Sequence, residues 1–210
     1  MNADRIAKVY RWIEYAVFGR ELERCRTDHL TATKDARRVL ILGEGDGRFL
    51  AALLRVNPTA FVDVVDASGE MLRLAARRIG GNERVRFWQD TENLRGPYDL
   101  IVTNFFLDCL TETEAAECIH RCAGALIPGG HWIVGEFQEH PGPPGWRTVH
   151  AWIWIRTMYL FFKLTTGLET RTIPNYERHL FIAGLHEKSR KTRRFGLMVS
   201  QLWIKRSDGS

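Results

Sequence analysis

Short runs of apolar, β-branched residues alternate along the chain with stretches whose apolar positions recur at helical spacing. The run at 39–42 is continuous and apolar, as in a strand buried on both faces of a parallel sheet. Further strands are predicted at 61–65, 85–88, 98–103 and 131–137, and helices at 48–56, 68–78 and 111–126. This alternation predicts an α/β fold, a doubly wound parallel sheet with helices on both faces.

Capping and turn residues support the limits of these elements. Ser68 is a predicted N-cap, and Thr111 with Glu114 forms the pattern of a capping box. Residues 128–130, Pro-Gly-Gly, predict a turn before the fifth strand. Outside this core we expect helices at 6–17, 21–30, 152–164 and 174–183, and two terminal strands at 185–191 and 195–205.

The length and composition fit one globular domain. The chain has 210 residues, of which 45% are hydrophobic and 26% charged, with a net charge of +5. We expect a helical N-terminal cap at 1–36 and a main domain at 37–210. Within that domain, residues 138–183 are expected to form a substrate lid. A charge excess this mild does not imply a nucleic-acid partner.

The cysteines and the N-terminus predict a cytoplasmic protein. The four cysteines form no CxxC pair, so we interpret them as small core residues, and a reducing compartment fits. No His, Cys or carboxylate cluster has metal-ligand spacing. The N-terminus is charged throughout, unlike a signal peptide. The most apolar stretch, 151–162, is too short for a transmembrane helix and contains Arg156.

Glycines and acidic residues follow three successive strands at their carboxyl ends. Gly43, Gly45 and Gly47 directly follow the first strand and open the next helix, where the backbone can approach a ligand. Asp66 ends the second strand and could accept both hydroxyls of a ribose, and Asp90 after the third could accept the amine of adenine. Ligands of open α/β sheets bind at this edge, so the sequence predicts a nucleoside-shaped site.

The glycine spacing argues against a dinucleotide cofactor. That fingerprint requires G-x-G-x-x-G, whereas here the pattern is G-x-G-x-G and the next residue is Arg48.

These segments together resemble class I S-adenosylmethionine (SAM)-dependent methyltransferases. The resemblance lies in residues 39–47 (VLILGEGDG), 64–72 (VVDASGEML), 87–90 (FWQD), 98–106 (YDLIVTNFF) and 128–130 (PGG). It implies a Rossmann-like, mostly parallel seven-stranded sheet with a C-terminal antiparallel hairpin, and SAM as cofactor. The implied cofactor-binding residues are Gly43, Glu44, Gly45, Gly47, Asp66, Ala67, Met71, Asp90, Thr91, Asn104 and Phe105.

One position departs from the family pattern. The family usually has an acidic residue in the first strand, where Ile41 stands here. We hypothesise that Glu44 or Asp46 supplies the missing carboxylate near the ammonium group of the cofactor.

The sequence contains fewer signals for the methyl acceptor site than for the cofactor site. A sulfonium methyl is already activated, so the protein mainly aligns the acceptor and excludes water. Asp108, His140 and His150 are candidate bases, but a helix-start aspartate and solvated loop histidines are the alternatives. The aromatic residues within 151–164 indicate a lid over a small apolar or aromatic acceptor, a helix packed on the core, or an interfacial helix that contacts lipid.

Three functions remain open at this point. The main prediction is a methyltransferase that acts on a small molecule. The alternatives are a catalytically silent SAM-binding module and another nucleotide-cofactor enzyme, such as an NAD-dependent oxidoreductase. The basic residues at 188–194 lack the interleaved aromatic residues of a nucleic-acid site, and the sequence does not predict an oligomeric state.

Overall fold

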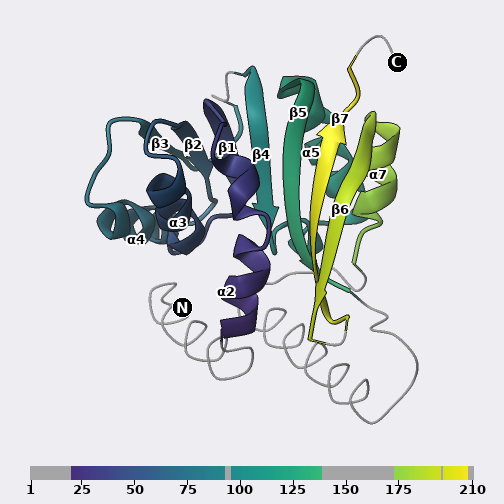
Figure 1. Cartoon of the computed structure of the whole chain (residues 1–210), viewed down its shortest axis with the longest axis horizontal. Helices are drawn as coiled ribbons and strands as arrows, with labels where there is room; N and C mark the ends of the chain where they lie inside the picture. The colour runs from purple at the N-terminus through teal and green to yellow at the C-terminus, as the bar shows by residue number, and fades with distance from the viewer. Residues whose placement is uncertain (1–19, 93–95, 139–172, 195, 208–210) are drawn as a thin grey trace.

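A seven-stranded sheet forms the centre of the protein (Figure 1). The computed structural model describes residues 20–92, 96–138, 173–194 and 196–207. The strands lie in the order β3-β2-β1-β4-β5-β7-β6. Their bounds are β1 Arg38–Leu42, β2 Phe61–Val65, β3 Val85–Trp88, β4 Tyr98–Asn104, β5 Leu126–Phe137, β6 Leu185–Arg193 and β7 Met198–Lys205.

The strand directions confirm the predicted fold class. The strands β1 to β5 pair in parallel, whereas β7 is antiparallel to both β5 and β6. In the register, Ile41 lies beside Val64 on one side and beside Val102 on the other. The sheet is therefore the doubly wound one predicted from the sequence, closed by the antiparallel C-terminal hairpin.

Helices cover both faces of the sheet. Their bounds are α2 Arg20–Thr27, η1 Leu30–Thr33, α3 Arg48–Val56, α4 Gly69–Ile79, η2 Leu107–Cys109, α5 Glu112–Ala125 and α7 Tyr176–Ile182. The helices α3 and α4 pack on Val39 and Ile41, whose side chains share one face of β1. The helices α5 and α7 pack on Leu40 and Leu42 on the opposite face, because side chains alternate along a strand.

The predicted helix caps are confirmed. The Ser68 hydroxyl accepts a hydrogen bond from the Met71 N–H (3.3 Å) at the start of α4. Thr111 and Glu114 form the reciprocal capping box of α5.

The predicted turn at 128–130 is instead part of a long β5. The register with β4 shifts between Tyr98, which lies beside Leu126, and Leu100, which lies beside His131. The extra residues bulge out of the ladder, because Pro128 has no N–H to donate and Gly129 has a φ of +74°.

The helix predicted at 21–30 ends three residues earlier than expected. The helix α2 ends at Thr27, whose hydroxyl bonds back to the carbonyl of Glu23 (2.8 Å), and η1 follows. The helices expected at 6–17 and 152–164 lie outside the described residues, as do His140 and His150.

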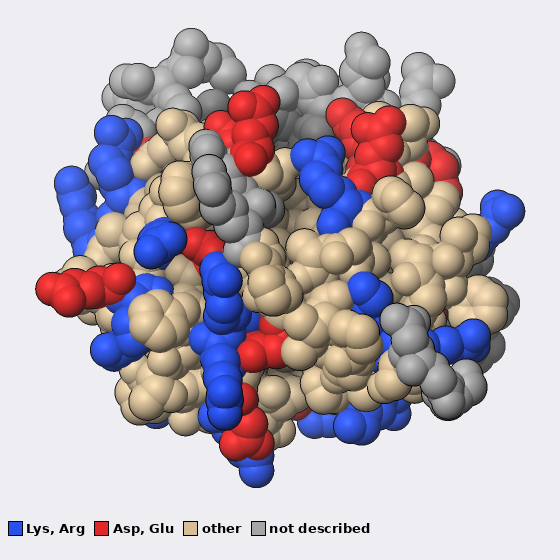
Figure 2. All heavy atoms as spheres, turned by 90° about the horizontal axis from the view of Figure 1, so that it is seen from above, with Lys and Arg blue, Asp and Glu red and all other residues tan. Residues whose placement is uncertain are grey.

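The described surface has mixed charge. Figure 2 shows Lys and Arg interspersed with Asp, Glu and uncharged residues on the face seen from above. None of the described helices is long and apolar enough to cross a membrane.

Candidate cofactor site

A glycine corner joins β1 to α3 at the carboxyl edge of the sheet. Gly43, Gly45 and Gly47 have φ angles of +67°, +68° and +85°, a conformation that costs other residues strain. A Cβ at Gly43 would lie 2.6 Å from Cδ2 of Phe106, and one at Gly47 would lie 2.6 Å from Cα of Ala75. At Gly45 no described atom lies within 4 Å of an added Cβ. The corner is thus tightly packed at both ends and open in the middle.

The carboxylate of Asp66 faces this corner from the end of β2. Its Oδ2 accepts a hydrogen bond from the Gly45 N–H (3.0 Å), and its Oδ1 accepts one from the Ser68 N–H (2.9 Å). An ionised carboxylate can accept about four hydrogen bonds, so each oxygen retains a free lone pair. Two backbone groups therefore orient Asp66 and leave it able to accept two hydroxyl groups.

Glu44 and Asp46, the two candidates for the acidic residue that the first strand lacks, have different surroundings in the structure. The carboxylate of Asp46 is bonded to Arg48 Nε (3.2 Å) and to Arg78 Nη2 (2.9 Å), between α3 and α4. Glu44 instead accepts the N–H of Leu50 (2.8 Å) in the first turn of α3. Burial raises the pKa of Glu44 to about 8. Glu44 is therefore a half-buried residue beside the corner, whereas Asp46 already has two cationic partners.

A buried amide lies at the end of β4. Asn104 is 6% exposed, and neither its amide nitrogen nor its oxygen has a hydrogen-bond partner among the described residues. Its oxygen lies against Gly135, where a Cβ would come within 2.6 Å of it. An unsatisfied buried amide costs about 1–3 kcal/mol, so a ligand that paired with it would be favoured.

Phe105 continues the chain from Asn104 in a strained conformation. Its φ is +55°, and its N–H donates to the carbonyl of Gly135 (2.6 Å). Its ring lies 4.8 Å from that of Phe137, and the guanidinium of Arg26 lies 5.5 Å from the ring centroid. Strain of this kind persists at sites whose surroundings hold it in place.

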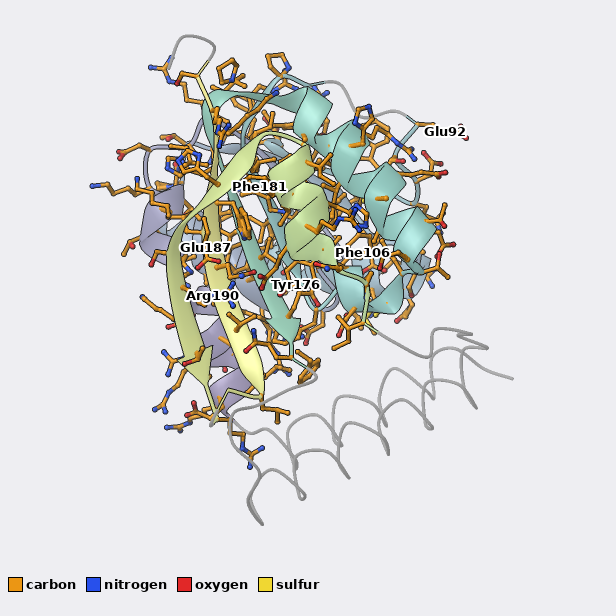
Figure 3. The ribbon with its side chains drawn as sticks, turned by 90° about the vertical axis from the view of Figure 1, so that its right-hand side faces the viewer. Glu92, Phe106, Tyr176, Phe181, Glu187 and Arg190 are labelled. Atoms are coloured by element: carbon orange, nitrogen blue, oxygen red, sulfur yellow. The ribbon has the colours of Figure 1, made fainter. Side chains whose placement is uncertain are left out.

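The remaining predicted contacts are less closely joined to the corner. Asp90 is exposed, and its Oδ1 accepts the N–H of Glu92 (3.0 Å). The hydroxyl of Thr91 accepts a hydrogen bond from Arg121 of α5 (2.7 Å). Figure 3 shows Glu92, two residues after Asp90, apart from Phe106.

The first turn of α4 holds the other two predicted contacts. Ala67 is exposed just before this helix, and Met71 is half-buried within its first turn.

Asp108 is part of a buried acidic pair rather than a solvated helix start. Asp108 is 8% exposed and Glu136 is fully buried. The N–H groups of Phe106 (3.3 Å) and Leu107 (2.9 Å) donate to Oε1 of Glu136. Burial raises the pKa of both carboxyls, and the negative charge of Asp108 raises that of Glu136 further.

Sequence reasoning missed Glu136 and Arg26. Glu136 is the one acidic residue of β5, in the apolar stretch after His131, which was the available signal. Arg26 had no signal, because its relation to Phe105 arises only when α2 packs on the sheet. Among the described residues no group of His, Cys, Asp and Glu could hold a metal ion.

The arrangement fits a nucleoside cofactor with an amino-acid end. The open corner at Gly45, the oriented carboxylate of Asp66 and the unsatisfied amide of Asn104 lie at the carboxyl ends of β1, β2 and β4, respectively. This is where open α/β sheets bind ligands.

Comparisons with known proteins agree with this geometry. Residues 40–132 match a family described as a methyltransferase domain. The chain is 30% identical over 127 residues to demethylmenaquinone methyltransferase of Clavibacter sepedonicus, covering 59% of this chain and 50% of that protein. It is also 30% identical over 129 residues to malonyl-[acyl-carrier protein] O-methyltransferase of Halalkalibacterium halodurans, covering 57% and 44%. The chain thus spans half or less of these relatives' length.

Solved structures share the fold at low identity. An O-methyltransferase family protein from Burkholderia thailandensis aligns with a TM-score of 0.68 and 21% identity, covering 100% of this chain and 62% of that one. The N-methyltransferase NodS of Bradyrhizobium japonicum in complex with S-adenosylhomocysteine (SAH) aligns with a TM-score of 0.63 and 17% identity, covering 90% and 88%. Human N-acetylserotonin methyltransferase in complex with SAM aligns with a TM-score of 0.61 and 16% identity, covering 92% and 58%. The family match over residues 40–132, the curated relatives and the seven-stranded fold agree with the resemblance to class I SAM-dependent methyltransferases.

Proposed function

We propose that this protein is an enzyme that transfers the methyl group of SAM to a small, apolar or aromatic acceptor. The observation that carries the proposal is the carboxylate of Asp66, which the N–H groups of Gly45 and Ser68 aim at the glycine corner. A carboxylate held in this way is suited to the two hydroxyls of a ribose.

The residues around the corner divide the recognition of SAM between them. Asp66 binds the ribose, Glu44 binds the ammonium group, and Asn104 binds a polar atom of the amino-acid end. Asp90 and Thr91 face the adenine amine, and Met71 with Ala67 packs on the base. Bound SAM supplies a methyl group that is already activated by its positive sulfur. The protein then orients the acceptor in line with this methyl group and excludes water.

The aromatic side chains beside the corner support an apolar acceptor. Phe105, Phe106 and Phe137 lie at the carboxyl ends of β4 and β5, on the side where an acceptor would approach. The relatives named for demethylmenaquinone and for N-acetylserotonin are consistent with such a molecule. We further propose that residues 1–36 form a cap and 138–183 a lid. All four cysteines are free thiols, which supports a cytoplasmic location.

Calorimetric titration tests cofactor binding. We expect the protein to bind SAM and SAH and not NAD. Asp66→Ala should weaken SAH binding about ten- to a hundredfold, because charge-assisted hydrogen bonds to the ribose are lost. Asp35→Asn, a change at an exposed carboxylate paired with Lys34, is the control and should bind SAH normally. Binding of NAD without SAM, or an unchanged affinity in Asp66→Ala, would refute the proposal.

A screen with methyl-labelled SAM tests the acceptor. Quinols, phenols and aliphatic acids form the panel, and transfer to an aromatic hydroxyl is expected. Tight SAM binding with no transfer to any acceptor would instead favour a catalytically silent SAM-binding module.

A further inference from the structure

Glu136 is buried on a face of β5 that otherwise carries apolar side chains. It shares this face with Trp132 and Val134, because side chains alternate along a strand, and all three are fully buried. Burying a carboxyl group is costly unless hydrogen bonds replace those it makes to water. The partners of Glu136 therefore decide what this position contributes.

Those partners are three consecutive N–H groups of the turn that follows β4. The N–H groups of Phe106 (3.3 Å) and Leu107 (2.9 Å) donate to Oε1, and that of Asp108 (3.4 Å) donates to Oε2. They lie at the start of η2, where the first N–H groups of a helix have no backbone acceptor. One side chain thus satisfies the whole turn.

Gly135, the neighbour of Glu136 in β5, contacts the segment just before this turn. Its carbonyl accepts the N–H of Phe105 (2.6 Å), whose φ of +55° is costly for a residue with a side chain. A Cβ at Gly135 would lie 2.6 Å from Oδ1 of Asn104, so the glycine leaves room for that amide. Two successive residues of β5 therefore hold segment 104–108 in place.

This segment forms one wall of the cofactor site. A Cβ at Gly43 would lie 2.6 Å from Cδ2 and 2.9 Å from Cβ of Phe106, so this side chain packs directly on the glycine corner. Asn104 is 6% exposed, and its amide has no partner among the described residues. A displacement of about 1 Å in such a segment is enough to weaken the groups it carries. Because Glu136 is itself fully buried, it acts on the site through the turn.

We propose that Glu136 is a positioning residue, which holds the turn after β4 so that Asn104 and Phe106 form the wall against which the amino-acid end of SAM binds. This inference rests on the proposed function, since it assigns a support to the same cofactor site.

Calorimetry with SAH and 5′-methylthioadenosine tests the inference. The second ligand keeps the adenosine and a thioether but lacks the amino-acid end. Glu136→Ala should weaken SAH binding about tenfold or more and leave 5′-methylthioadenosine within about threefold, because only SAH reaches this wall. Glu136→Gln keeps one oxygen for the N–H groups of the turn and should bind SAH within about threefold of the wild type.

Asp99 offers a matched control at the opposite end of β4. Its Oδ2 accepts the N–H of Arg37 (2.8 Å) and its Oδ1 accepts that of Arg38 (3.1 Å), so it also supports consecutive backbone N–H groups. Asp99→Ala should lower stability and still bind both ligands within about threefold of the wild type.

Hydrogen exchange in the wild-type protein gives a second measurement that needs no variant. The N–H groups of Phe106, Leu107 and Asp108 should exchange at least about tenfold more slowly with SAH bound than with 5′-methylthioadenosine bound.

The outcomes separate positioning from a structural role. Equal weakening of both ligands in Glu136→Ala, or an unchanged affinity for SAH, would overturn the inference. Equal exchange rates with the two ligands would overturn it as well, and this readout decides the matter if Glu136→Ala does not fold. Failure of the wild-type protein to bind either ligand would overturn the proposed function itself.

Discussion

Glu44 gives a quantitative prediction, because its ionisation should control cofactor affinity. Burial raises its pKa to about 8, so at pH 7 only about one molecule in ten carries the carboxylate before binding. An ammonium group of a ligand favours the ionised form strongly. Binding of such a ligand should therefore release a proton from Glu44.

The magnitude follows from the ionised fraction. With a pKa of about 8, that fraction is about one in a hundred at pH 6 and about one half at pH 8. If SAH binds the ionised form, its affinity should rise up to about fiftyfold over this range. The sign is that of a carboxyl with a raised pKa, since lowering the pH removes the charge the ligand needs.

Calorimetry of SAH binding in buffers of different ionisation enthalpy measures both quantities. At pH 7 we expect release of about 0.9 proton from the wild-type protein. Glu44→Gln should bind SAH more weakly at pH 8, with an affinity that depends little on pH. Asp46→Asn should behave like the wild type, because that carboxylate is already paired with Arg48 and Arg78.

An SAH affinity of the wild-type protein that does not change with pH would refute this reasoning. An unchanged affinity in Glu44→Gln together with a weakened Asp46→Asn would transfer the role to Asp46.

Three further predictions concern stability. Gly47→Ala should destabilise the fold by about 2–4 kcal/mol in urea unfolding, because its φ is +85° and the new Cβ would meet the backbone of Ala75. The control Gly124→Ala, in an open helical position, should stabilise the fold by about 0.5–1 kcal/mol. Equal effects of the two substitutions on the free energy of unfolding would contradict the packing argument. Glu136→Ala should cost about 2–4 kcal/mol by leaving buried N–H groups unpaired, whereas Glu136→Gln should be much milder. Both carboxyls of the Asp108–Glu136 pair have raised pKa values, so their contribution to stability is complete below about pH 4 and declines as the pH rises toward the folded pKa values. In thermal unfolding, the melting temperature of Glu136→Gln should therefore fall less steeply with rising pH than that of the wild type. A steeper fall would contradict the shared burial of the two carboxyls.

Local patterns predicted those parts of the fold that local interactions determine. The strand at 61–65 and the helix at 48–56 begin and end as expected, because each is bounded by its own turn or proline signal. The parallel order followed from the alternation of elements, and Asp66 from its place at a strand end. The extension of β5 through Pro128 was not predicted, because a bulge depends on the neighbouring strand.

The site residues that were missed depend on packing between distant segments. In the sequence, Glu136 is a single acidic residue in a mostly apolar strand. Its role is seen only in the structure, where the backbone N–H groups of Leu107 and Asp108 donate to its carboxyl group. Arg26 was one of several charges in a polar helix, and only the docking of α2 set it over Phe105. Asn104 was predicted from the family motif, but its lack of a partner could be seen only in three dimensions.

The bond between Asp28 and Arg193 joins positions 165 residues apart. A growing chain that has emerged as far as β5 already contains the glycine corner and Asp66, but Leu197 and Met198, on which α2 also packs, have yet to be synthesised. During translation, α2 would therefore be seated last, when the final strand is added between β5 and β6. A shortened product that ends before that strand would keep every recognisable motif and still lack the surface that holds α2 in place.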